Sequence, residues 1–84
     1  MKSPTGRYTD WSAVISRARK ADGAFVLAFP DQLSSVLYTV RERKARELHM
    51  ADGYLMAELR NRHVDDEGRT RGDLYVAFTR AKRV

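Results

Sequence analysis

The chain of 84 residues contains no cysteine and only two prolines. Without cysteine it can form neither a disulfide nor a thiolate metal site, which is typical of proteins in a reducing cytoplasm. Its longest apolar run, Ala24 to Phe29, has six residues, whereas a membrane-spanning helix needs about 20. The first residues are not followed by an apolar stretch, so they do not predict a signal peptide. We therefore expect a cytoplasmic protein with no membrane association, and a single domain, because most domains have about 100–150 residues.

Charge gives the first indication of function. Sixteen Lys and Arg residues against eleven Asp and Glu residues give a formal net charge of +5, and twelve of the basic residues are arginine. A basic domain attracts polyanions, and the planar guanidinium pairs with phosphate or guanine through two parallel hydrogen bonds. A GC-rich genome also encodes arginine in place of lysine, so this bias leaves the function open.

Apolar spacing predicts a first helix over residues 10–21. Trp11, Val14, Ile15 and Ala18 follow the i, i+3, i+4, i+7 spacing of one helix face, and Thr9 or Asp10 can cap its start. We expect residues 1–9 to be a flexible N-terminal arm and residues 10–84 to be the domain.

The middle of the chain predicts a strand and a second helix. Ala24 to Phe29 has no polar alternation, which is typical of a central strand that is buried on both faces, and we expect Pro30 to end it. The second helix begins at Asp31 or Ser34, uses Leu33, Val36, Leu37 and Val40 as its apolar face, and ends between Lys44 and His49.

Two alternating stretches predict a closing antiparallel hairpin. Residues 54–63 would pair with residues 72–80, and the polar stretch from His63 to Gly72 would form a tip that carries Arg69 and Arg71 beyond the sheet. The expected fold is α+β with the order α-β-α-β-β. Three strands form one sheet, and both helices cover one face of it.

Groups for catalysis or metal binding are few. His49 and His63 have no second ligand at helical spacing. Three adjacent acids, Asp65 to Glu67, fit a solvated turn better than a calcium loop, whose alternating spacing they lack. We therefore predict no enzyme, no metal and no cofactor. A small ribonuclease that uses His63 and neighbouring arginines stays as a distant alternative.

Basic residues near the hairpin and at the helix end are the first candidates for a binding surface. A ribbon with projecting arginines can enter a DNA groove, and arginine favours a narrow minor groove. Pairs such as Glu42 and Arg46, four residues apart, could equally form a self-neutralising helix end. The candidate nucleic-acid-binding residues are Arg41, Arg43, Lys44, Arg60, Arg62, Arg69, Arg71, Arg80, Lys82 and Arg83.

The alternative is a protein-interaction module. With both helices on one face of the sheet, the other face would be available for a partner or for a second copy of the chain. The candidate interface residues are Tyr54, Met56, Tyr75 and Ala77.

A diffuse resemblance covers most of the chain. The residues that carry it are Trp11, Val14, Arg17, Gly23, Phe29, Pro30, Ser34, Ser35, Val40, Arg41, Gly53, Glu58 and Arg60. With these residues the chain resembles small proteins of actinobacteria and their phages that have no assigned activity. The resemblance implies the same element order and a phage or actinobacterial source. We expect a small nucleic-acid-binding protein, with DNA favoured, that acts as a phage accessory or regulatory factor and forms a homodimer. The alternative is binding to a host or phage protein.

Overall fold

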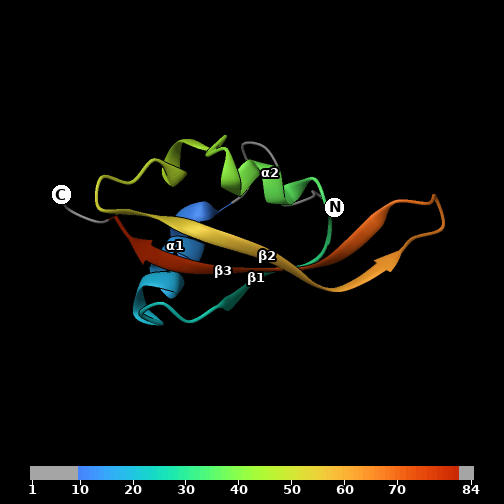
Figure 1. Cartoon of the computed structure of the whole chain (residues 1–84), viewed down its shortest axis with the longest axis horizontal. Helices are drawn as coiled ribbons and strands as arrows, with labels where there is room; N and C mark the ends of the chain where they lie inside the picture. The colour runs from blue at the N-terminus through green and yellow to red at the C-terminus, as the bar shows by residue number, and fades with distance from the viewer. Residues whose placement is uncertain (1–9, 82–84) are drawn as a thin grey trace.

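The computed structural model describes residues 10–81. The elements in chain order are α1 (Trp11–Lys20), β1 (Val26–Leu33), α2 (Val36–Arg41), the 3₁₀ helix η2 (Arg46–Leu48), β2 (Gly53–Val64) and β3 (Thr70–Arg80). Figure 1 shows β2 and β3 crossing in front of α1, with α2 above the strands. This order and the antiparallel three-stranded sheet confirm the expected α+β fold. The expected arm, residues 1–9, lies outside the described residues.

Helix α1 forms as its spacing predicts. The Asp10 carboxylate accepts a hydrogen bond from the backbone N–H of Ala13 at 3.1 Å, which satisfies a donor that the helix itself leaves unpaired. Its four predicted apolar residues are all buried. The rings of Trp11 and Phe29 pack edge to face with their centroids 5.4 Å apart, so the helix is fixed against β1.

The core lies between the helices and one face of the sheet. Apolar residues of α1 and α2 join one cluster with inward-facing residues of β2 and β3, among them Leu55, Leu74 and Val76. Leu74 and Val76 are completely buried. The opposite face of the sheet has no helix of residues 10–81 packed on it.

The prediction that Ala24 to Phe29 is the central strand was wrong. The sheet order is β1-β3-β2, so β3 is central and β1 is an edge strand. Leu27, which pairs with Tyr75 on the outer face, is 38% exposed. An unbroken apolar run does not distinguish a strand covered on both faces from an edge strand with one apolar face open.

The second helix is also shorter than predicted. Pro30 does not end β1, because it falls in an irregular part of an edge strand where its missing N–H is not needed. The strand therefore runs through Asp31 to Leu33, and α2 has only six residues. Arg43 ends it with a left-handed φ of 51°. The chain then returns to the core at Leu48, which is 1% exposed.

The hairpin of β2 and β3 is confirmed and longer than predicted. Gly53 pairs with Arg80 at one end and Val64 pairs with Thr70 at the other. Its outer half extends beyond the helices, as Figure 1 shows at the right of the molecule. Arg71 lies within this ladder, opposite His63, and not beyond the sheet as predicted.

Candidate binding surface

Two bulges flank the central strand where the hairpin leaves the core. β1 is irregular between Phe29 and Gln32, and β2 is irregular between Arg60 and His63. Each bulge contains a residue with a left-handed backbone, Asp31 with φ 50° and Asn61 with φ 57°. Short polar side chains tolerate this conformation better than bulky ones.

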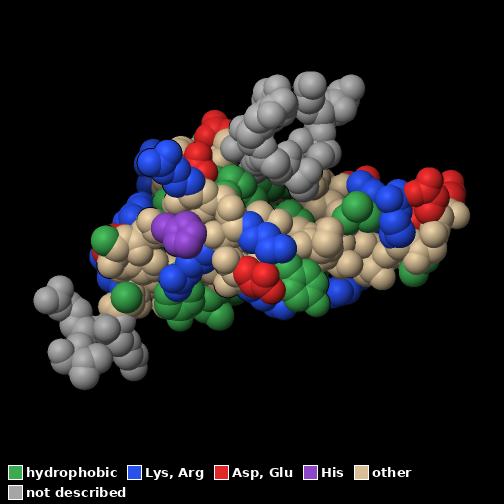
Figure 2. Space-filling view, turned by 90° about the horizontal axis from the view of Figure 1, so that it is seen from above, with side chains coloured by type: hydrophobic (Ala, Val, Ile, Leu, Met, Phe, Trp, Pro, Cys, Tyr) green, Lys and Arg blue, Asp and Glu red, His purple; other side chains and the backbone are tan. Residues whose placement is uncertain are grey.

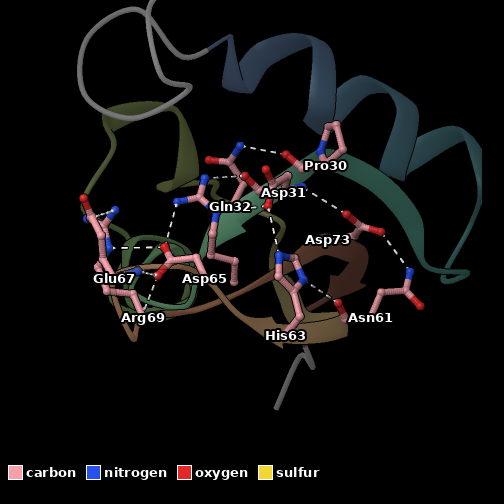
Figure 3. Close-up of polar contacts among 10 residues, drawn as sticks. Pro30, Asp31, Gln32, Asn61, His63, Asp65, Glu67, Arg69 and Asp73 are labelled. Carbon is pink, nitrogen blue, oxygen red and sulfur yellow. Dashed lines mark hydrogen bonds and ion pairs between the residues drawn. The ribbon is translucent and has the colours of Figure 1, made fainter.

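The Asp73 carboxylate holds both bulges. One oxygen accepts the backbone N–H of Asp31 at 2.9 Å, and the other accepts the side-chain amide of Asn61 at 2.8 Å (Figure 3). These donors, the Asn61 amide first, lower the pKa of Asp73 below its ordinary value. One residue of the central strand therefore connects both neighbouring strands at this point.

Arg71 belongs to a charge network at the base of the hairpin arm. Its Nε donates to the Asp31 carboxylate at 3.0 Å, and its Nη2 donates to the Asp31 carbonyl at 2.9 Å. A second carboxylate, that of Asp65, is 3.7 Å from Arg71 Nη1. The Arg71 side chain is only 25% exposed, so a phosphate would have to displace two acids to reach it.

Arg69 is held in the hairpin turn. It forms ion pairs with Asp65 and Glu67, both drawn in Figure 3. The backbone N–H groups of Arg69 and Glu67 also donate to the Asp65 carboxylate, and with the Arg69 charge they lower the pKa of Asp65. Acidic side chains gather at this end of the molecule, at the right of Figure 2. The turn is thus internally neutralised.

His63 lies in an acidic setting. Its Nε2 is 3.6 Å from Asp31 Oδ1, and its Nδ1 is 3.3 Å from the carbonyl of Asn61. The open pocket of about 500 Å³ beside it is lined by four carboxylates and one arginine. A phosphate would be repelled there, which gives no support to the ribonuclease alternative. Among residues 10–81, no group of three acidic or histidine side chains could hold a metal ion.

Arg60 is fixed on the outer face of the sheet. It forms an ion pair with Glu58, and its guanidinium carbon lies 4.3 Å from the centre of the Tyr75 ring and 5.3 Å from that of Phe25. A guanidinium over an aromatic face is stabilised by the negative potential of the ring. Arg60 therefore bridges β2, β3 and the segment before β1.

The remaining basic candidates are scattered. The Lys44 ammonium is 3.8 Å from Glu42, Arg80 lies 5.8 Å from the Phe78 ring at the end of β3, and Arg62 has no ion pair among residues 10–81. Lys82 and Arg83 lie outside the described residues.

Charge in the described part of the chain is nearly balanced. Four of the sixteen basic residues, Lys2, Arg7, Lys82 and Arg83, lie outside it, so residues 10–81 hold twelve basic against eleven acidic residues, a formal net charge of +1. Figure 2 shows the basic side chains in separate groups with acidic ones between them. The predicted arginines do not merge into one positive face on the side that it shows.

Arg41 and Arg43 have a different environment. Together with residues 54–57 of β2, they line a groove of about 400 Å³. Arg43 lies 5.9 Å from the Tyr54 ring, and Arg41 makes a long hydrogen bond of 3.5 Å to the carbonyl of Ala57. Neither arginine has an ion pair with an acid among residues 10–81.

The predicted protein-interface residues share the outer face of the sheet. Tyr54 and Met56 on β2 are 38% and 48% exposed, Tyr75 on β3 is half-buried, and Ala77, which pairs with Met56, is buried without belonging to the core cluster. Leu27 of β1 extends this face. Three of the five exposed large hydrophobic side chains of residues 10–81 are therefore on one face.

Sequence reasoning missed Phe25 and Leu27 as surface residues, because it assigned their whole apolar run to the core. It also missed the ion pair between Arg19 and Asp52, at 2.8 Å. The hydrogen bonds from Arg19 lower the pKa of Asp52 to about 2. No local spacing could have indicated this pair, since 33 residues separate its members.

No helix of residues 10–81 is both long and apolar enough to cross a membrane. Comparisons with protein-family models, curated proteins and solved structures found no match to the chain. The resemblance to actinobacterial and phage proteins therefore stays a prediction.

Proposed function

We propose that the chain is a cytoplasmic, non-catalytic binding protein that docks a partner protein on the outer face of its sheet. The observation that carries this proposal is the gathering of Leu27, Tyr54 and Met56, all exposed, on the one sheet face without a helix. Exposed apolar side chains that gather on one face are typical of protein interaction sites. The fixed Arg60 and Tyr75 add the residue types that are enriched in such interfaces.

The charge arrangement favours a protein partner over a general polyanion. Three of the five candidate arginines on the hairpin, Arg60, Arg69 and Arg71, have acidic partners. Release of counterions from nucleic acid needs cations that are free to neutralise phosphates. A folded part with a net charge of +1 provides little of this driving force.

Nucleic acid is the second candidate. Arg41 and Arg43 without an acidic partner, beside the Tyr54 ring, could bind a single strand through phosphate contacts and base stacking. In that case affinity would fall steeply with salt, by about one counterion per phosphate contact. A docked protein that covers the apolar face gives a much shallower dependence.

Site-specific photo-cross-linking in the producing cell tests the proposal. A benzoylphenylalanine replaces Leu27 on the outer face, and the control carries it in place of Tyr38, which is exposed on α2. We expect one discrete protein adduct from position 27 and none from position 38. A dimer-sized adduct would identify the partner as a second copy, which sedimentation equilibrium would confirm. Equal adducts from both positions, or adducts that nuclease removes, would refute the proposal.

A further inference from the structure

The two edges of the sheet differ in their ability to accept another strand. β1 contains Pro30 and two irregularities, and both features oppose edge-to-edge pairing. β2 pairs residue by residue with β3 from Gly53 to Arg60 without a bulge. Every second residue of such a strand turns its backbone N–H and C=O groups to the open side. The β2 edge is therefore the one able to accept an added strand.

A groove runs along this edge. It is formed by residues 54–57 and by the two arginines that follow α2, and its volume is about 400 Å³. Within residues 10–81, the only side-chain hydrogen bond along it is the long one from Arg41 to the Ala57 carbonyl. A contact of 3.5 Å is at the limit of hydrogen bonding, so a ligand can replace it at small cost.

The positive charge of the groove favours a ligand with acidic groups. Arg41 and Arg43 enter it from the helix side and have no ion pair with an acid of residues 10–81, whereas Arg19, Arg60, Arg69 and Arg71 all do. A second copy that paired its own β2 with this edge would bring the same two arginines to the shared seam. Like charges there oppose a symmetric dimer, and carboxylates are the matching groups.

We propose that the β2 edge binds an extended acidic segment of the partner protein as a fourth strand. Side chains of a strand point alternately to the two faces. Carboxylates on one face of the added strand would reach Arg41 and Arg43, and apolar side chains on the other would continue the surface of Tyr54 and Met56. This inference rests on the proposed function and specifies its partner as a segment with alternating acidic and apolar residues.

A labelled peptide provides the direct test. The probe is a fluorescein-labelled peptide of about eight residues that alternates glutamate with valine, and its control carries lysine for glutamate. We expect saturable fluorescence anisotropy with the first peptide only, and slower amide hydrogen exchange in Gly53 to Arg60 on binding. The variant Arg41→Gln with Arg43→Gln should lose about 2–30-fold in affinity, because exposed ion pairs contribute little each.

The matched control is Arg62→Gln, which removes another exposed arginine and should leave the affinity unchanged. Three results would overturn the inference: no saturation up to millimolar peptide, exchange protection outside β2, or equal loss in the control variant. Binding of a single-stranded oligonucleotide that depends on Arg41 and Arg43, without peptide binding, would also overturn the inference and would show that the groove binds nucleic acid. If position 27 gives a protein adduct but the β2 edge shows neither peptide binding nor exchange protection, only this inference is overturned and the proposed function stands.

Discussion

The substitution Gly72→Ala tests the packing at the base of the hairpin. Gly72 lies in central β3, is buried, and does not have a positive φ. Glycine within a strand costs about 0.5–1 kcal/mol relative to alanine through backbone entropy. From conformation alone, Gly72→Ala should therefore stabilise the protein.

The packing around Gly72 predicts the opposite effect, a loss of stability. A Cβ atom at position 72 would lie 2.7 Å from the carbonyl oxygen of Arg60 and 2.8 Å from Cγ of Leu59. The first contact is with backbone at the β2 bulge, which cannot move without disturbing the ladder. Overpacking in a close-packed interior costs about 1–3 kcal/mol, so we expect a net loss of about 1–2 kcal/mol. For a domain of this size that corresponds to a fall in Tm of about 4–16 °C.

Thermal unfolding followed by circular dichroism measures the effect. A double-mutant cycle with Leu59→Ala, which removes Cγ, should show that Gly72→Ala costs less in that background, with a coupling of about 0.5 kcal/mol or more. The control is Gly68→Ala in the turn, where φ is 78° but no atom lies within 4 Å, so its cost is purely conformational. An unchanged or higher Tm for Gly72→Ala would refute the close approach of β2 and β3.

Two further predictions concern the residue that ends α2 and the ion pair between Arg19 of α1 and Asp52. Arg43→Gly should raise the Tm by a few degrees, because glycine adopts the left-handed φ of 51° without the steric cost, about 1 kcal/mol, that arginine bears; a lower Tm would contradict this. The carboxylate of Asp52, whose pKa is lowered to about 2 by Arg19, adds stability that is fully present above its unfolded pKa of about 3.9 and is lost as the pH falls through 2. Asp52→Asn should therefore reduce the fall in the free energy of unfolding at acid pH, measured by urea unfolding, and leave its pH dependence above pH 5 unchanged. If the fall at acid pH is the same in the variant, the ion pair is not formed.

Local patterns predicted the element types because each depends on neighbours within a few residues. The spacing from Trp11 to Ala18 sets one helix face, and the alternation in 54–60 and 74–79 sets the two strands of the hairpin. The same reasoning failed at Pro30 and Asp31. A proline followed by a possible cap residue indicates the start of a helix only when the two residues do not form a bulge in a strand, as Pro30 and Asp31 do in β1.

Candidate site residues were predicted less well than elements. The candidate interface residues Tyr54, Met56, Tyr75 and Ala77 lie together on one face, since alternation fixes which side chains share a face. The arginines were not brought together, since their environments depend on acids distant in the chain, as Asp31 is from Arg71.

The sequence by itself determined the order of helices and strands, the hairpin, and the apolar faces of the first helix and of the two hairpin strands, because helix and strand periods are local properties of the chain. Only the tertiary structure decided that β3 is central, that β2 offers an open edge, and that most hairpin arginines are neutralised. Those outcomes depend on pairings between residues up to 50 positions apart, such as Val26 with Val76. A pattern that spans only a few neighbouring residues carries no information about such pairings.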